Sequence, residues 1–199
     1  ERREVVTALY WLSPVLLFVA YWHGQLDVIP VLFFVASVAL IRSGNMAAAG
    51  AALGLSIAAK LSMLLVVPFL VIFLERNNRY RTIRTRFLVW FAGTTLIVQG
   101  LALLSPSAQA MILGSPLIWR ILDAAIPISE RVLIYLFPLV YLLLVASAWV
   151  LGRMTVALLH AFLAIAFLSI VLLSDSPVGW HVWAVPFVAL CAAGDSRQL

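Results

Sequence analysis

Charged residues are scarce in this chain. They make up only 11% of its 199 residues, whereas hydrophobic residues make up 65%, and the mean hydropathy is +1.12. Apolar runs of about 14 to 22 residues recur along the sequence, and one soluble core of this size does not hold so many interior helices. The composition therefore excludes an ordinary soluble domain and predicts a polytopic α-helical membrane protein.

Cysteine is limited to Cys191, which lies inside an apolar run, so intrachain disulfides are excluded. No group of His, Cys and Asp has the spacing of a structural metal site. A phosphate-binding loop is excluded as well, because Gly50 and Gly54 follow no strand and no Lys-Ser or Lys-Thr pair comes after them. These two glycines instead form a small-residue face, which is typical of close helix packing.

The apolar runs also lack the alternation of apolar and polar residues that a spanning β-strand requires. Residues 31–41 and 156–173 are apolar on every side, which favours spanning helices. Internal repeats, low-complexity tracts and a separable soluble segment are missing too. We therefore expect an all-α fold in which residues 1–199 form a single transmembrane domain.

Basic residues give the chain a net charge of +5 and a pI near 10.0, a balance that could indicate nucleic-acid binding. Their placement argues against nucleic-acid binding. Most of the basic residues flank the apolar runs at every second end, which is the same side of a membrane if the runs span it. The positive-inside rule makes that side cytoplasmic, so the basic excess predicts topology. Ten of the 13 basic residues lie there: Arg2, Arg3, Arg42, Arg76, Arg79, Arg81, Arg84, Arg86, Arg153 and Arg197.

Eight helical segments follow from this orientation, of which about six are full spans and two are short helices. Residues 46–59 and 61–74 are each about 14 residues and roughly 21 Å long, too short for a hydrocarbon core of about 30 Å. We expect them to form a hairpin on the cytoplasmic side, with Lys60 near its tip. Residues 105–130 are expected to form an external loop lying partly on the membrane surface. The six spans are residues 5–22, 26–41, 87–104, 132–151, 154–173 and 180–193.

Ionisable residues from three separate loops fall on the external face in this topology. Their convergence predicts one external polar site, to which Lys60 contributes if its hairpin reaches the outer third of the bilayer. The residues of this face are His23, Asp27, Arg120, Asp123, Glu130, Arg131, Asp175 and His181.

Three motifs stand out in the first part of the chain: Trp11-Leu12-Ser13-Pro14, His23-Gly24-Gln25-Leu26-Asp27, and Gly50 to Gly54 with Lys60 and Pro68. Together with the short-helix hairpin, their order resembles the GT-C superfamily, the polytopic membrane glycosyltransferases that use polyprenyl-phosphate sugars as donors. The resemblance covers about residues 9–75. A weaker likeness follows at Ser176-Pro177 and at Trp180-His181-Val182-Trp183 before Pro186.

Within that superfamily, the dolichyl-phosphate-dependent glucosyltransferases carry a helix ending in His-x-Gln-x-Asn, which His23, Gln25 and, conservatively, Asp27 match. Bacterial relatives have a Gly-Gln pair where this chain has Gly24 and Gln25. The resemblance implies transfer of a hexose, such as mannose or glucose, from a polyprenyl-phosphate donor. The implied acceptor is a glycolipid, a lipid-linked glycan or a polysaccharide at the extracytoplasmic face of a bacterial inner membrane or an ER membrane.

The catalytic carboxylate of that family usually lies in the first external loop, and this sequence begins after the place of that loop. Because the sequence starts with Glu1-Arg2-Arg3-Glu4 rather than Met, we expect it to be a fragment. The base would then lie on the missing part or on another membrane chain that supplies those helices, or else the chain is inactive. Asp27 is the candidate catalytic base within this chain, although the resemblance does not assign it that role.

Transfer from a lipid phosphate requires a base for the acceptor hydroxyl and positive charge near the departing phosphate. We predict Asp27 for the first task and substrate contacts from His23, Gln25 and His181. The predicted phosphate partners are Lys60 and Arg120. A divalent ion, Mg²⁺ or Mn²⁺, is an alternative source of that charge.

Simpler interpretations stand beside these roles. Residues 23–27 could be only a polar turn, and Lys60 could reach lipid headgroups without a ligand. His160 is interpreted as a helix-packing hydrogen bonder. The charged residues of the external loop fit ion pairs with one another: Arg120, Asp123, Glu130 and Arg131. Five aromatic residues fit the belt at a headgroup boundary: Tyr21, Trp22, Trp119, Trp180 and Trp183.

Two other functions remain open at this stage. A transporter or flippase of lipid-linked sugars also uses paired short helices with a charge at membrane depth. A non-catalytic subunit would only pack against other membrane chains. An inverted repeat favours the transporter, and an acidic residue in a first external loop favours the enzyme.

Overall fold

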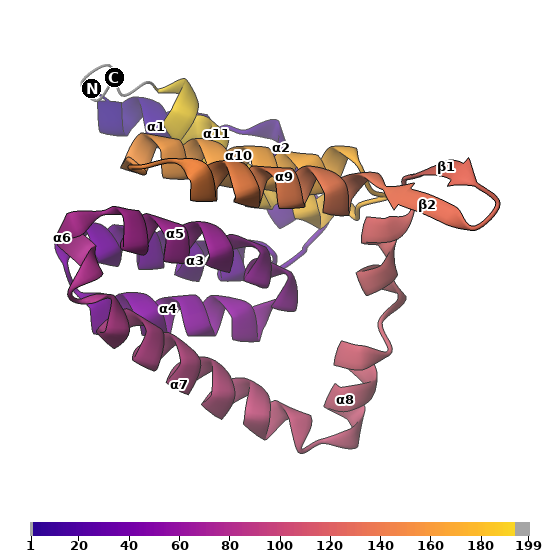
Figure 1. Ribbon diagram of the computed structural model, residues 1–199, viewed down its shortest axis with the longest axis horizontal. Coiled ribbons are helices and arrows are strands. Elements are labelled where there is room, and N and C mark those ends of the chain that lie inside the picture. The colour runs from indigo at the N-terminus through magenta and orange to yellow at the C-terminus, as the bar shows by residue number, and fades with distance from the viewer. Residues whose placement is uncertain (1, 194–199) are drawn as a thin grey trace. The chain divides into compact units, whose positions relative to one another are not determined.

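The computed structural model describes residues 2–193, and this part of the chain is mostly helical. Residues 2–193 form eleven α-helices, four short 3-10 or π turns and one two-stranded hairpin (Figure 1). The predicted all-α fold class is therefore confirmed, with the hairpin as the one departure in the described residues. Asp195 and Arg197, the second of which counts in the topology prediction, lie outside the described residues.

The chain divides into two compact units. The first comprises residues 1–27, 68–73 and 117–199, and the second comprises residues 28–67 and 74–116. The first unit contains α1 (Arg2–Trp11), α2 (Pro14–Leu17), η1 (Phe18–Trp22), most of η3 (Pro116–Leu122), β1 (Ala125–Ser129), β2 (Val132–Tyr135), α9 (Leu136–Val150), α10 (Val156–Leu172), η4 (Val178–Trp183) and α11 (Val185–Ala192).

The core of the first unit is aromatic. The rings of Phe167 on α10 and Phe187 on α11 stack at 6.0 Å, and Trp183 lies edge-on to Phe167 at the same separation. His160 on α10 also contacts the Phe187 ring, with 6.2 Å between the ring centroids. These contacts fix α10, η4 and α11 against one another.

The N-terminal segment is bent rather than continuous. Residues 5–22 were predicted as one span, but the axes of Glu4–Trp11 and Pro14–Trp22 differ by 47°. Pro14 lacks a backbone N–H and its ring disfavours helical geometry at Ser13, so one helix ends before it and another begins at it. The number of possible membrane spans therefore depends on whether this bent pair is counted as one span.

In the second unit, α4 (Met46–Ala59) packs against both α3 (Val28–Ser43) and α7 (Arg84–Leu103) (Figure 1). Gly50 and Gly54 lie on the face of α4 that meets α7. A Cβ added to Gly54 would come within 2.8 Å of Thr94 Cβ, and one added to Gly50 would overlap the Phe87 backbone. The predicted small-residue packing face is thus confirmed. The unit also contains η2 (Leu61–Val66), α6 (Asn78–Arg81) and α8 (Pro106–Leu113).

Buried serines link these helices through hydrogen bonds. Ser37 Oγ on α3 donates to the Ala49 carbonyl at 2.8 Å, and Ser56 Oγ on α4 donates to the Pro30 carbonyl at 2.7 Å. Gln99 on α7 donates to a carbonyl near the end of α4 at 3.2 Å. The hydroxyls of Ser37 and Ser56 thereby have a partner, as an apolar surrounding requires.

Only the first of the two predicted short helices is a regular α-helix over its whole length. Residues 46–59 coincide with α4, but residues 61–74 begin as the 3-10 turn η2 and continue in α5 (Val67–Arg76), which opens with Pro68 near its N-terminus. Lys60 has extended backbone angles between α4 and η2. Lys60 therefore lies at the junction of the two segments, while the cytoplasmic hairpin and the membrane depth of Lys60 stay predictions.

Helix lengths in the described residues vary widely. Only α7 is both long and apolar enough to cross a membrane as one straight helix, and the bent N-terminal pair makes a second if it is counted as one span. Five further apolar helical segments have 10–17 residues: Val28–Ser43, Met46–Ala59, Leu136–Val150, Val156–Leu172 and Val178–Ala192.

Residues 105–130 are more ordered than the expected external loop. They contain α8, η3 and the strand β1, which pairs antiparallel with β2. The predicted span 132–151 accordingly begins as a strand and becomes helical only at Leu136. Isoleucine and valine in an exposed stretch, with Pro127 in β1, favour extended backbone over helix there.

Candidate functional site

A polar turn at residues 23–27 joins η1 to the start of α3. Gly24 has φ +68°, a left-handed conformation that lets the chain reverse. The backbone N–H of Gln25 then donates to the Val19 carbonyl at 3.1 Å, which holds the turn against η1. Asp27 is the last residue before α3. The turn therefore has a defined conformation in which successive side chains differ sharply in exposure.

Asp27 is the buried member of this turn, with only 7% of its surface exposed. Its Oδ1 accepts a hydrogen bond from the indole Nε1 of Trp183, at 3.2 Å. The two residues are 156 positions apart in sequence. This bond brings the His-Gly-Gln-Leu-Asp segment and the Trp-His-Val-Trp segment into one place within the first unit.

Gly179 forms the contact between the same two segments. A Cβ on Gly179 would overlap both Oε1 of Gln25 and Oδ2 of Asp27, so the two side-chain oxygens lie against one glycine. Oε1 of Gln25 is buried and accepts no hydrogen bond from the residues that the structure describes. Two hydrogen-bond acceptors thus lie near each other, an arrangement that fits a donor such as a hydroxyl group between them.

Trp180 and Trp183 stack on each other beneath this contact, with 5.0 Å between ring centroids and 23° between ring planes. They are 5% and 0% exposed. The interpretation of these two residues as part of an aromatic belt is therefore wrong, because a headgroup boundary requires exposed rings. Trp183 instead donates its indole N–H to Asp27, and Trp180 stacks on Trp183. Tyr21, Trp22 and Trp119 are exposed as a belt would require.

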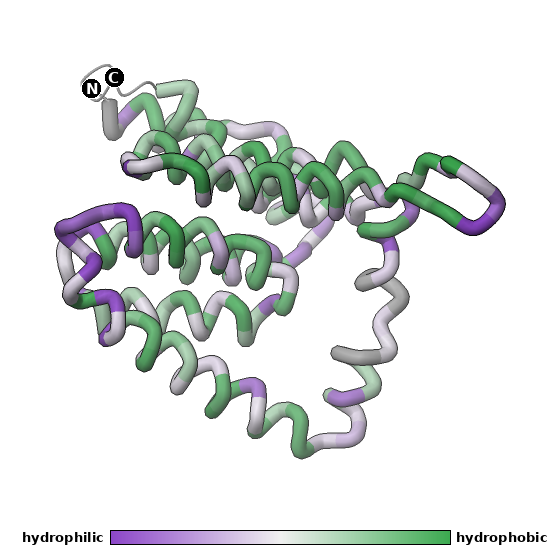
Figure 2. Tube along the Cα trace, in the orientation of Figure 1, coloured by the Kyte–Doolittle hydropathy of each residue, from purple (hydrophilic) through white to green (hydrophobic). Residues whose placement is uncertain are grey.

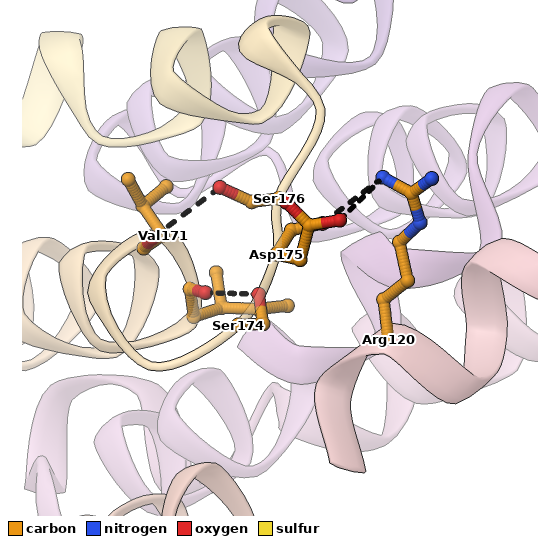
Figure 3. A network of polar contacts seen from close by, with 6 residues as sticks. Arg120, Val171, Ser174, Asp175 and Ser176 are labelled. Carbon is orange, nitrogen blue, oxygen red and sulfur yellow. Dashed lines mark hydrogen bonds and ion pairs between the residues drawn. The ribbon is translucent and has the colours of Figure 1, made fainter. Parts of the chain in front are cut away.

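Arg120 and Asp175 form a second polar cluster in the first unit (Figure 3). Nη1 of Arg120 lies 3.4 Å from Oδ2 of Asp175 and donates to its backbone carbonyl at 3.1 Å. Ser176 Oγ donates to the Val171 carbonyl at 3.3 Å, and Ser174 Oγ donates to the carbonyl of Ile170. The serines fix the loop after α10, and the loop in turn positions the carboxylate that holds Arg120.

This pairing corrects the interpretation of Arg120 as part of an ion pair within its own loop. Its partner comes from the loop between α10 and η4, 55 positions away. The hairpin residues Glu130 and Arg131 are exposed at the turn between β1 and β2. The predicted convergence of external charges therefore holds for Arg120 with Asp175, but not as one cluster that includes the hairpin tip.

His181 lines a mainly apolar cavity of about 310 Å³. Its Nδ1 lies 3.1 Å from the Val178 carbonyl, which orients the ring. Ser13 is the other polar residue of the lining, and the rest comes from apolar side chains of α1, α2, α10 and α11, among them Leu9, Leu168 and Val188. A mainly apolar cavity with two polar residues in its lining suits an amphiphilic molecule.

The remaining candidates stay apart from these contacts. His23 is exposed, whereas Gln25 is half-buried and Asp27 is buried, and the His23 ring lies 6.3 Å from that of Phe18. Lys60 belongs to the second unit. Within residues 2–193, no three His, Cys, Asp or Glu side chains are grouped so that they could hold a metal ion. The alternative of Mg²⁺ or Mn²⁺ remains a prediction, and no step below depends on it.

Gly179 and Ser13 were not among the residues predicted for a site. Gly179 lies in a stretch, Ser174 to Gly179, that has the composition of an ordinary turn, so its contact with Gln25 leaves no pattern in the sequence. Ser13 precedes Pro14 in the first motif, and it lines the same cavity as His181.

Replacing Arg120 with alanine is expected to change stability by only about 0.2–1 kcal/mol, because its ion pair is exposed. If Arg120 binds a donor phosphate, the same change raises KM for the donor and leaves the midpoint of thermal unfolding nearly constant. Arg120→Lys keeps the charge but loses the two-point contact with Asp175, so we expect an intermediate KM. An unchanged donor KM in both variants would rule out phosphate binding by Arg120.

No family model, curated protein or solved structure matches this chain.

Proposed function

We propose that this protein is a multi-pass membrane glycosyltransferase of the GT-C type. In this proposal it transfers a sugar from a polyprenyl-phosphate donor to a glycolipid, a lipid-linked glycan or a polysaccharide on the extracytoplasmic face. The observation that carries the proposal is the hydrogen bond between Asp27 and Trp183. It joins one of the main motifs of the family resemblance to the segment of weaker likeness, although the two lie at opposite ends of the sequence.

Exposed apolar helix surfaces support the membrane location. Only 6% of the most apolar window of α7 is buried, so leucine, isoleucine and valine side chains cover its outside. Figure 2 shows hydrophobic residues along most of α9 and α10 and hydrophilic ones around α6. A helix of 17 residues such as α10 is about 26 Å long, which a slightly thinned bilayer accommodates. We retain about six spans and a short pair as the proposed topology.

The acceptor pair formed by Gln25 and Asp27 supports a hydroxyl-bearing substrate. A sugar or acceptor hydroxyl could donate to Oε1 of Gln25, which is buried and accepts no hydrogen bond from the described residues. In our proposal the Asp27 carboxylate takes the proton of the acceptor hydroxyl as the hydroxyl oxygen attacks the anomeric carbon, and the lipid phosphate leaves with the bonding electrons. Gln25 and the exposed His23 contact the sugar.

Cationic side chains are assigned to the departing phosphate. Arg120 supplies full positive charge, and His181 supplies a ring nitrogen in the lining of a mainly apolar cavity. The cavity walls would hold the first isoprene groups of the donor, so that the lipid remains in an apolar environment while its phosphate faces water. In this proposal, polar side chains contact the phosphate of the donor and apolar side chains contact its lipid tail.

The test is a transfer assay with the purified protein in lipid nanodiscs. Radiolabelled polyprenyl-phosphate mannose and glucose are supplied separately with a polyprenyl-linked glycan acceptor, and the label is followed into product. We expect label in the acceptor with one of the two donors. Movement of intact donor between the leaflets of vesicles, without transfer, would instead identify a flippase, and absence of both activities would contradict an active role for this chain.

A further inference from the structure

The hairpin of β1 and β2 exposes apolar side chains on both of its faces. Ile126 pairs with Ile134 on one face, and Pro127 pairs with Leu133 on the other. Ile126 and Ile128 are 48% and 61% exposed. Figure 2 shows both strands as hydrophobic and the connecting turn as hydrophilic. An isolated two-stranded hairpin is marginal in water, so this one requires a surrounding that covers both faces.

A folded partner does not meet that requirement. Strand addition would cover one edge, and packing of a second copy would cover one face, leaving the opposite isoleucines or leucines exposed. Lipid surrounds an inserted element from all sides. The hydrocarbon core itself is excluded, because the outer edges of a two-stranded hairpin carry backbone groups that need hydrogen-bond partners. The headgroup layer supplies both water and apolar contact.

Continuity with α9 places the hairpin at such a layer. β2 runs directly into α9, with Tyr135 as the residue that precedes the helix, and the hairpin extends away from the end of α9 (Figure 1). The 15 residues of α9 span about 23 Å and the four residues of β2 add about 13 Å. Together they reach about 36 Å, which exceeds a hydrocarbon core of about 30 Å by part of one headgroup layer.

We propose that residues 125–135 form an interfacial anchor that crosses the outer headgroup layer. The Ile126 and Ile134 pair lies at the boundary of the acyl chains, Ile128 lies among the headgroups, and the turn with Glu130 and Arg131 emerges into water. This inference rests on the membrane location in the proposed function and is independent of the transferase chemistry.

Depth-resolved fluorescence tests this arrangement. In a Cys191→Ala background, which removes the only cysteine, Ile126→Cys, Ile128→Cys and Glu130→Cys are made singly and labelled with an environment-sensitive fluorophore. The protein is reconstituted in vesicles of phosphatidylcholine and phosphatidylglycerol. One set of vesicles contains lipid with a nitroxide high on the acyl chain, and another receives iodide on both sides of the membrane.

The anchor predicts opposite orders for the two quenchers. Loss of fluorescence by acyl nitroxide decreases from Ile126→Cys to Ile128→Cys to Glu130→Cys, and loss by iodide increases in that order. Equal access of iodide to all three positions would place the hairpin in water and overturn the proposal. Protection of Ile126→Cys and Ile128→Cys from both quenchers would reveal protein packing and overturn it as well. Transfer assays on the unlabelled protein decide the proposed function separately.

Discussion

Asp27→Ala is expected to reduce glycosyl transfer by about 10²–10⁴-fold, the range for loss of a catalytic base. The variant should also lose about 1–3 kcal/mol of stability, because the buried Nε1 of Trp183 loses its acceptor. The measurement is the initial rate of transfer under saturating donor, together with the midpoint of thermal unfolding in the same detergent. The protein is expected to remain folded.

Asp27→Asn distinguishes a catalytic role of Asp27 from a structural one. Asparagine keeps the size of the side chain and an oxygen that accepts from Trp183, but its amide is no base. If Asp27 takes the proton, Asp27→Asn is as inactive as Asp27→Ala while its unfolding midpoint stays near that of the wild type. Full activity of Asp27→Asn would show that the carboxylate only supports the fold, and the catalytic role would be withdrawn.

Gly179→Ala is expected to have the second large effect. The added methyl group would overlap the oxygens of Gln25 and Asp27, so η4 and the turn at residues 23–27 must separate. Overpacking of this kind costs about 1–3 kcal/mol, or roughly 2–4 °C of unfolding midpoint per kcal/mol in a chain of this size. Transfer should fall more steeply than stability, because the displaced groups are the proposed substrate contacts.

Gly152→Ala is the matched control. Gly152 lies in the exposed connection between α9 and α10, and a Cβ there would meet no atom within 4 Å. The same substitution should therefore leave both the unfolding midpoint and the transfer rate near those of the wild type. Similar values for Gly179→Ala and Gly152→Ala would mean that η4 and the turn at residues 23–27 do not meet at Gly179.

Much of the helical organisation could be predicted from the sequence. The boundaries of α4 match the predicted segment 46–59, since Asn45 caps the helix and Lys60 ends it. Hydropathy also located α7 and α10 to within a few residues. The hairpin was missed because its apolar residues continue into those of α9, and hydropathy alone does not distinguish an exposed strand from the first turns of a span.

The candidate site was predictable in part. The polarity of residues 23–27 marked the turn, but burial of Asp27 depends on a tryptophan 156 positions away, a distance over which periodicity carries no signal. The same limit explains the error at Trp180 and Trp183, whose positions near a helix end resemble those of interfacial residues. Arg120 was assigned to its own loop because proximity in sequence was the only available guide to its partner.

The central claim is that the turn at residues 23–27 and η4 form one site. A double-mutant cycle with Asp27→Ala, Trp183→Phe and the combined variant measures this coupling through the free energy of unfolding. The hydrogen bond between Asp27 and Trp183 predicts a coupling of about 1.5–3 kcal/mol, typical of a bond to a charged group. Effects that add to within about 0.5 kcal/mol would contradict the contact and the site built on it.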